Sequence, residues 1–212
     1  MPILMTFGDS NTHGTPPILD RGEYRRFGKG VRWPTVTHAA LGPDWELVEE
    51  GLPGRTAQYD DPVMGDIMNG RPALRMALQS HGPIDVMTLM LGTNDVKTRF
   101  ASDPAQVVAG VAGLLDVAMS LDYQQRHGGF RILLICPPPV VETGTIKTEF
   151  WCGAARSQAL APLYADLARS RGVGFLDAGS VIEVSPIDGV HFDEAAHARL
   201  GAAVADAVTS LI

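Results

Sequence analysis

The alternation of short apolar runs with longer segments of helical spacing most constrains how this chain can fold. Five runs have the length and composition of strands, most of them buried on both faces: 3–7, 45–49, 85–91, 131–136 and 173–177. Segments of helical spacing lie between and after them, at 33–41, 71–81, 103–121, 151–172 and 193–212. The alternation predicts a five-stranded parallel sheet with helices on both faces, an α/β fold.

Local signals agree with these boundaries. Pro34 and Pro104 suit the first turn of a helix, and Asp103 suits an N-cap. No linker, repeat or low-complexity tract interrupts the 212 residues, so we expect one domain over 1–212. The stretch 137–150 is the longest irregular piece, and we expect it to form a loop over one end of the sheet.

Composition argues against several classes of function. The chain has 17 Lys and Arg against 24 Asp and Glu, a formal net charge of -7, so nucleic acid is not an expected partner. No apolar run approaches the roughly 18 residues of a membrane span, and the first residues do not resemble a signal peptide. We expect no membrane association and a cytoplasmic location. Cys136 and Cys152 lack metal-ligand spacing and are predicted to be buried, reduced thiols.

Four polar, glycine-containing segments follow four of the predicted strands. They are GDSN at 8–11, EGLPGRT at 50–56, GTND at 92–95 and SPIDGVHF at 185–192. Ligands of an open parallel sheet bind beyond the carboxyl ends of its strands. We therefore expect the four segments to meet at one edge of the sheet.

Ser10, Asp188 and His191 are the candidate catalytic residues. Asp188 and His191 are three residues apart in a predicted turn, so the carboxylate can bond Nδ1 of the imidazole and leave Nε2 for the serine proton. A helix-like turn starting at Ser10 would place its positive end beside the hydroxyl. Each feature also has a simpler explanation, since GDS often ends a strand and an aspartate often caps a helix beside a half-buried histidine.

Acyl transfer also requires donors for a developing oxyanion. The backbone N–H of Gly54, the side-chain amide of Asn94 and the backbone N–H of Ser10 are candidates. Gly54 could instead serve only as a turn residue after a proline, and Asn94 could serve only to stabilise the end of a strand.

FGDSN, EGLPGRT, LGTND and DGVHF resemble, in order and spacing, the four sequence blocks of the SGNH (GDSL-type) hydrolases, and the resemblance covers the whole chain. It implies a three-layer, flavodoxin-like fold with strand order 2-1-3-4-5, Ser10 as nucleophile, Asp188 and His191 completing a triad, and Gly54 and Asn94 as oxyanion donors. We expect no metal and no cofactor.

Two departures from the family pattern stand out. Asn11 replaces the leucine of GDSL, and we expect this to alter only packing near the serine. No asparagine precedes Gly54, which leaves open what supports the oxyanion donors.

More narrowly, VRWP, EEGLPGRT, DDPV, MNG, MLGTNDVK and DAGSVI resemble the oligomeric bacterial arylesterase and acyltransferase branch. This resemblance implies hydrolysis of short acyl esters through an acyl-serine, with transfer to alcohols. It also implies a homo-oligomer, such as an octamer, whose neighbouring subunits narrow the channel to Ser10. Related members deacetylate carbohydrates, so a carbohydrate O-deacetylase is the alternative.

Two other classes of function are less well supported. A metal hydrolase would use His191, Glu194 and His197, but their spacing matches neither HExxH nor HxxEH, and we expect Glu194 and His197 in the exposed first turns of the last helix. A non-enzymatic nucleotide- or flavin-binding module would suit the fold class, but GKGVRW fails the GxGxxG pattern.

Overall fold

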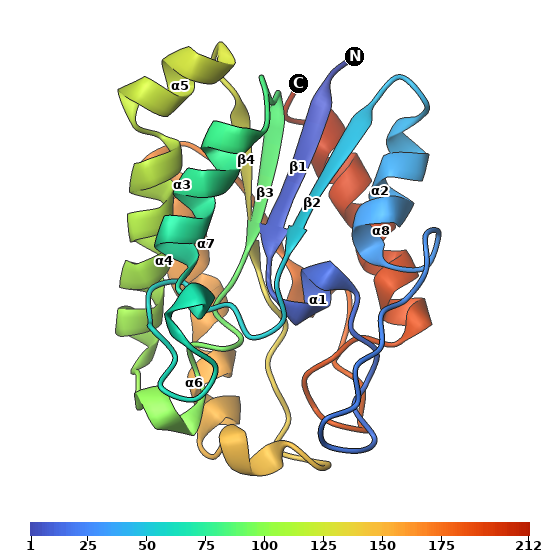
Figure 1. Cartoon of the computed structure of the whole chain (residues 1–212), viewed down its shortest axis with the longest axis vertical. Coiled ribbons are helices and arrows are strands. Elements are labelled where there is room, and N and C mark those ends of the chain that lie inside the picture. The colour runs from blue at the N-terminus through green and yellow to red at the C-terminus, as the bar shows by residue number, and fades with distance from the viewer.

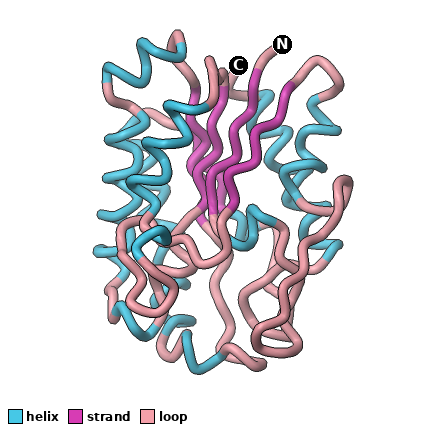
Figure 2. Tube along the Cα trace, viewed as in Figure 1, coloured by secondary structure: helices cyan, strands magenta, loops and turns pink.

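A five-stranded parallel sheet forms the centre of the protein in the computed structural model, which describes residues 1–212. The strands are β1 (Ile3–Gly8), β2 (Glu46–Gly51), β3 (Val86–Met90), β4 (Arg131–Cys136) and β5 (Gly174–Asp177). Their order is β2-β1-β3-β4-β5, and every neighbouring pair is parallel. Figure 2 shows the strands in the middle, helices on both sides and loops gathered at one end. The fold class and strand order are confirmed.

Two layers of helices cover the sheet (Figure 1). Helices α2 (Trp33–Leu41) and α8 (Glu194–Thr209) pack together on one face. The other face carries α3 (Gly70–Ser80), α4 (Pro104–Ala118) and α7 (Leu160–Arg171). The short helices are α1 (Ser10–His13), α5 (Leu121–His127) and α6 (Gly153–Gln158), and single 3₁₀ turns occur at Asp66–Met68, Thr98–Phe100, Lys147–Glu149 and Ala178–Ser180.

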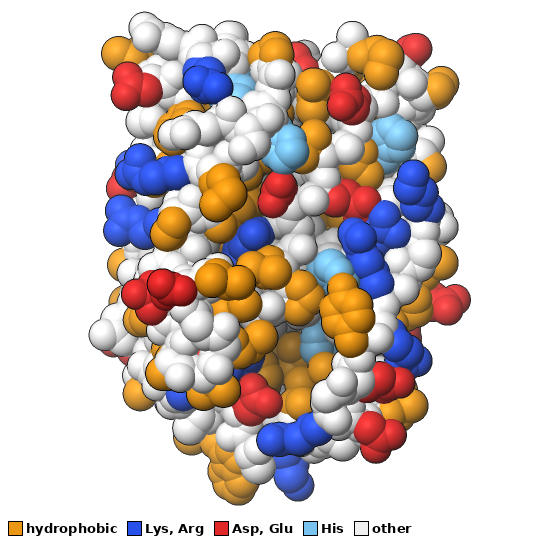
Figure 3. Space-filling model, in the orientation of Figure 1, with side chains coloured by type: hydrophobic (Ala, Val, Ile, Leu, Met, Phe, Trp, Pro, Cys, Tyr) orange, Lys and Arg blue, Asp and Glu red, His pale blue; other side chains and the backbone are white.

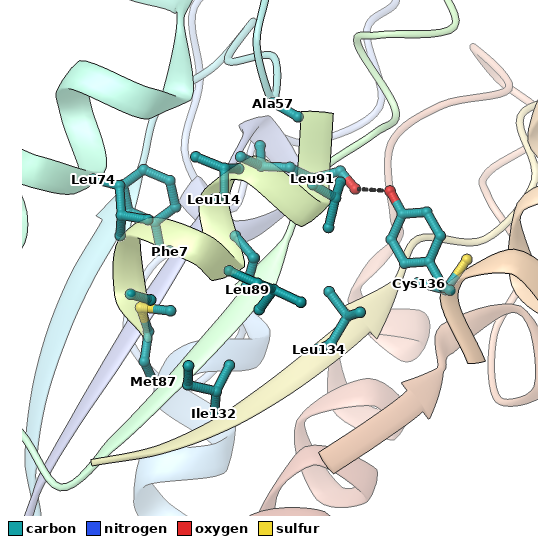
Figure 4. Close-up of a cluster of buried hydrophobic side chains, with 14 of the residues drawn as sticks. Phe7, Ala57, Leu74, Met87, Leu89, Leu91, Leu114, Ile132, Leu134 and Cys136 are labelled. Atoms are coloured by element: carbon teal, nitrogen blue, oxygen red, sulfur yellow. Dashed lines mark hydrogen bonds between the residues drawn. The ribbon is translucent and has the colours of Figure 1, made fainter. Parts of the chain in front are cut away.

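Alternate residues of the central strands enter two separate cores. In β4, Ile132 and Leu134 point into the core beneath α3, α4 and α7, where Figure 4 shows them among other apolar side chains. Leu133 and Ile135 enter the core beneath α2 and α8. Burial on both faces is the reason that residues 132–136 of the strand are all apolar instead of alternating with polar residues.

The helix-start signals are confirmed, but one predicted helix is divided in two and one further helix was not predicted. Pro34 and Pro104 lie in the first turns of α2 and α4, and Asp103 caps α4 in a capping box. The predicted helix over 151–172 is divided into α6 and α7, near Pro162, which lacks the N–H that a continuous helix would use. The sequence pattern did not reveal α5.

Residues 137–150 follow β4 as a loop with one 3₁₀ turn, but they are not the longest irregular stretch. Residues 14–32 form a longer segment without helix or strand. The backbone N–H of Val141 donates to the carbonyl of Gly189 at 2.8 Å. The 137–150 loop therefore supports the 185–192 segment that carries two of the candidate catalytic residues.

The two cysteines are both free, but only Cys136 is buried. The prediction was wrong for Cys152, which is exposed just before α6, where the chain runs at the surface. No single helix is long and apolar enough to cross a membrane; α4 and α5 reach that length and composition only together, across a 53° bend.

His197 is buried between α8 and α2, although we expected an exposed position. Its Nδ1 accepts the backbone N–H of Trp33 at 3.2 Å. Trp33 is the first residue of α2, and the N-cap Arg32 makes no side-chain capping bond, so His197 satisfies a donor that the helix leaves free. Phe27 and Phe192 pack edge-on against the imidazole. This burial lowers the pKa of His197 to about 4.

The first prediction follows from this pKa. Because the folded-state pKa lies below the unfolded value of about 6.5, the unfolded chain binds the extra proton as the pH falls, and stability present at neutral pH is lost toward pH 4. Between pH 7 and pH 5 the loss from His197 is about 2 kcal/mol in the free energy of unfolding. Urea unfolding of the wild type and His197→Asn at both pH values measures it, since asparagine does not titrate. Equal losses in the two proteins would contradict the prediction.

Candidate active site

Ser10, His191 and Asp188 form a hydrogen-bonded chain beyond the carboxyl ends of the strands. Nε2 of His191 lies 3.0 Å from Oγ of Ser10, and Nδ1 lies 2.6 Å from Oδ2 of Asp188. All three side chains are buried. Because Nδ1 faces a carboxylate, it carries the imidazole proton, and Nε2 is left as an acceptor for the serine proton.

Ser10 is the first residue of α1, two residues after β1 ends. Asp9 caps this short helix, and its Oδ1 accepts the backbone N–H of Asn11 at 2.9 Å. As the first helical residue, Ser10 has no acceptor for its own N–H within α1. The predicted helix-like turn at Ser10 is confirmed, and the N–H and the hydroxyl of one residue are both positioned by it.

Asp188 is held as an ionised carboxylate. Its Oδ1 accepts the backbone N–H groups of Val190 and His191 at 3.0 Å each, and its Oδ2 accepts the N–H of Ile18 at 2.7 Å. Burial alone would raise the pKa of Asp188, but the bond to the His191 ring, the charge of that ring and the backbone donors hold the pKa below its ordinary value. The negative charge that stabilises an imidazolium is therefore in place.

The turn between Asp188 and His191 requires a glycine. Gly189 has a φ of 73°, in the left-handed region, and a Cβ there would lie 1.8 Å from the carbonyl oxygen of Val141. The glycine thus allows the 185–192 segment to pack directly on the backbone of the 137–150 loop.

Gly54 and Asn94 line the same pocket as Ser10 and His191. Gly54 has a φ of 91°, and its N–H makes no hydrogen bond within the protein. Nδ2 of Asn94 donates to the carbonyl of Arg55 at 3.1 Å, and its second hydrogen has only the more distant Oδ2 of Asp9, at 3.4 Å. The N–H of Gly54, the amide of Asn94 and the N–H of Ser10 are thus donors available to a negatively charged oxygen in this pocket.

The turns that follow β1, β2 and β3 are joined by hydrogen bonds. These bonds support the candidate oxyanion donors, although the chain lacks the asparagine that the family pattern has before Gly54. The carbonyl of Arg55 accepts from Asn94, and the N–H of Ala57 donates to both carboxylate oxygens of Asp95 at 3.0 Å. Nη1 of Arg55 donates to the carbonyl of Gly8 at 3.0 Å. These bonds connect the turns that follow β1, β2 and β3, so the donors are held in place before a ligand arrives.

Asn11 does more than alter packing, and our expectation for it was wrong. Its buried Nδ2 donates to the carbonyl of Val190 at 3.1 Å, next to His191 in the chain. A leucine at this position could not make this bond, because it has no polar atom. The asparagine therefore joins the turn of Ser10 to the segment that carries the histidine.

The pocket over Ser10 has a volume of about 210 Å³. Figure 3 shows a hollow in this face of the molecule, bordered by hydrophobic, histidine and charged side chains. Its charged wall includes Lys97 and Glu149, which sequence reasoning did not identify. Both come from loops, 52 positions apart in the sequence, and no local spacing signals that they meet.

His191, Glu194 and His197 do not converge on a metal site. Glu194 is exposed at the start of α8, and His197 is buried against α2. No group of three or more His, Cys, Asp or Glu residues is arranged to hold a metal ion.

Comparison with known proteins identifies the family. The model of the GDSL-like Lipase/Acylhydrolase family matches residues 6–199. The chain belongs to this family. Among solved structures, this GDSL-family protein is similar to a carbohydrate acetylesterase from Sinorhizobium meliloti, with 33% identity, a TM-score of 0.94 and 100% of both chains covered. It is also similar to the M. smegmatis aryl esterase, with 35% identity, a TM-score of 0.92 and 100% of both chains covered. No curated protein matches the chain.

Family membership and these similarities show that this GDSL-family chain is an ester-hydrolysing enzyme. They agree with a site in which a buried hydroxyl, an adjacent imidazole and several hydrogen-bond donors share one small pocket.

The second prediction concerns the carboxylate of Asp188. In Asp188→Asn, the amide can donate to Nδ1, so the proton moves to Nε2 and the imidazole can no longer accept from Ser10. We expect turnover to fall by about a thousandfold or more, measured with an aryl acetate under saturating conditions. Asp193→Asn is the matched control, because Asp193 caps α8 in the same region of the chain and does not line the pocket. Similar turnover in the two variants would contradict the prediction.

Proposed function

We propose that the protein is a serine esterase for short acyl esters that transfers the acyl group to water or to small alcohols. The observation that carries this proposal is the 3.0 Å contact between Nε2 of His191 and Oγ of Ser10, with Asp188 bonded to the opposite ring nitrogen. In the first step, Ser10 attacks the ester carbonyl carbon and its proton passes to His191. Asp188 stabilises the imidazolium that forms.

The developing oxyanion would accept from the N–H of Gly54, the amide of Asn94 and the N–H of Ser10. The imidazolium of His191 then gives its proton to the departing alcohol, leaving an acyl ester on Ser10. Water or a second alcohol, deprotonated by His191, attacks this ester and releases the acid or a new ester. Each proton taken up by the imidazole is returned within the same half-reaction.

The size of the pocket supports a preference for short acyl groups. Its volume of about 210 Å³ is below the roughly 300 Å³ at which pockets for drug-sized ligands begin. Ile146 and Phe150 line it from the loop after β4, and Met64 and Ile18 line it from other segments. Elsewhere in this loop, Val140 is buried in the core and Val141 is exposed, so neither lines the pocket. Apolar walls around a buried serine also limit the water that competes with an alcohol for the acyl-serine.

A carbohydrate O-deacetylase is the second candidate. The similarity to the S. meliloti carbohydrate acetylesterase, at 33% identity over both complete chains, favours it. The same acyl chemistry would apply, with a sugar hydroxyl as the leaving group.

The third prediction tests chain length and transfer together. With vinyl acetate and excess primary alcohol in buffer, the enzyme should form new ester as well as free acetate, and a decanoyl donor should react at least about tenfold more slowly because the pocket excludes it. Both products are quantified by chromatography, alongside an acetylated sugar as a second leaving group. Ser10→Ala should retain less than about a thousandth of the activity. Equal rates for acetyl and decanoyl donors would reject the narrow pocket, and a fully active Ser10→Ala would reject the acyl-serine.

We also propose a homo-oligomer, for which the octamer implied by the resemblance is the specific expectation. Three large apolar side chains support it, since they are exposed on the loops around the site: Val141 at 51%, Trp151 at 55% and Ile187 at 46%. Burial of such side chains favours association. The fourth prediction is a mass by light scattering that is a multiple of the 22.6 kDa chain, with Trp151→Glu shifting it toward the monomer. A monomeric wild type at micromolar concentration would contradict it.

A further inference from the structure

Lys97 is the only lysine or arginine among the residues that line the catalytic pocket. The residue as a whole is only 6% exposed, and it faces the pocket. Nζ lies 3.6 Å from Oε2 of Glu149, which is longer than a normal hydrogen bond, and 5.6 Å from the centre of the Phe150 ring. An ammonium has three N–H donors and no acceptor, so these donors lack a close partner in the protein.

The ion pairs that involve Lys97 and its neighbours Arg99 and Arg21 contain more positive than negative groups. Oxygens of Glu149 lie 3.6 Å from Nζ of Lys97, 3.6 Å from Nη1 of Arg99 and 3.9 Å from Nη2 of Arg21. One carboxylate therefore pairs with three cations. Asp61 lies 2.9 Å from Arg99 and offsets part of this charge. The five residues together carry three positive and two negative charges. Asp9, whose charge also interacts with Lys97, is a further acid in this region.

The other acid in the pocket wall does not neutralise Lys97. Glu23 also lines the pocket, but its carboxylate pairs with Arg25 at 2.8 Å. Burial and the charge of Arg99 lower the pKa of Lys97, while Glu149 and Asp61 oppose that shift. A buried cation in this position is stabilised by whatever negative oxygen enters the pocket.

We propose that Lys97 binds an ionised carboxylate carried by the ester substrate, on either the acyl group or the leaving alcohol. This inference rests on the proposed function, because the carboxylate must enter the pocket that contains Ser10. The two oxygens of the substrate carboxylate would accept hydrogen bonds from the Lys97 ammonium. Such charge-assisted hydrogen bonds are about twice as strong as neutral ones. A neutral hydroxyl would satisfy the donors without offsetting the charge. The enzyme therefore prefers an anionic ester to its neutral counterpart.

The fifth prediction compares two matched pairs of esters. Phenyl hydrogen succinate and methyl phenyl succinate differ by a carboxylate on the acyl side, and 4-acetoxybenzoate and its methyl ester differ by one on the leaving group. The ratio of kcat/KM, anionic over neutral, is measured for the wild type and Lys97→Met. We expect Lys97→Met to lower this ratio by about tenfold to a hundredfold in at least one pair, the range expected for a bond between charged groups. The pair that responds identifies the side of the ester that carries the anion.

Two further variants make the test specific. Lys147→Met removes an exposed lysine two residues from Glu149 and should change the ratio by less than about twofold, because an exposed charge is screened. Glu149→Gln removes the carboxylate that pairs with Lys97, so a substrate anion no longer competes with it and the ratio should rise. This variant tests the proposal even if Lys97→Met does not fold.

Several results would overturn the subsite. A ratio that is unchanged by Lys97→Met in both pairs, or lowered equally by Lys147→Met, would overturn it, and so would a ratio that Glu149→Gln fails to raise. If the wild type cleaves the neutral esters but the ratio gives any of these contradicting results, the proposed function stands and the subsite alone is rejected. A wild type that cleaves none of the four esters would reject both.

Discussion

The parallel pairing of β1 between β2 and β3 is the constraint on which the site depends. The register places Gly8 opposite Gly51 on one side and Met90 on the other, so the three strands end at the same level. The turns that follow them must begin side by side, and this brings Ser10 and the candidate oxyanion donors into one pocket. Because β1 is hydrogen-bonded along both edges, the end that carries the serine cannot shift without breaking two ladders. Donors held in this way need no reorganisation when negative charge develops.

The sheet does not position the other half of the site. Asp188 and His191 follow β5, an edge strand, and reach Ser10 only through a long irregular segment. Individual bonds between side chains and backbone hold them instead: the N–H of Ile18 to Asp188, and Nδ2 of Asn11 to the carbonyl before His191. Each such bond contributes only about 1 kcal/mol net, but a buried polar group left without one costs more. The geometry of the acid-base pair therefore depends on residues that take no part in proton transfer.

The bonding partners of each buried acid determine whether burial raises its pKa. Asp188 receives three backbone N–H groups and the imidazole, and these outweigh its burial. Asp9 and Asp95 are also buried, and burial raises the pKa of Asp9 to about 6 and that of Asp95 to about 7 despite their backbone donors. Of these three buried acids, Asp188 alone has a lowered pKa, and it is the one bonded to the His191 ring.

Sequence pattern alone predicted the strands, most helices and the α/β class, because burial on both faces of a parallel sheet demands continuous apolar runs. It also predicted the four turns, because tight turns demand glycine and short polar residues. The candidate triad was also recognisable, since Asp188 and His191 are near neighbours in the chain. The partners of buried polar atoms were not: His197 faces α2, Asn11 bonds a carbonyl 179 positions away, and Lys97 meets Glu149 across two loops. Apolar periodicity is written in adjacent residues, whereas a hydrogen bond or ion pair depends on which distant atom arrives within about 3 to 4 Å, and only the packed tertiary structure decides that.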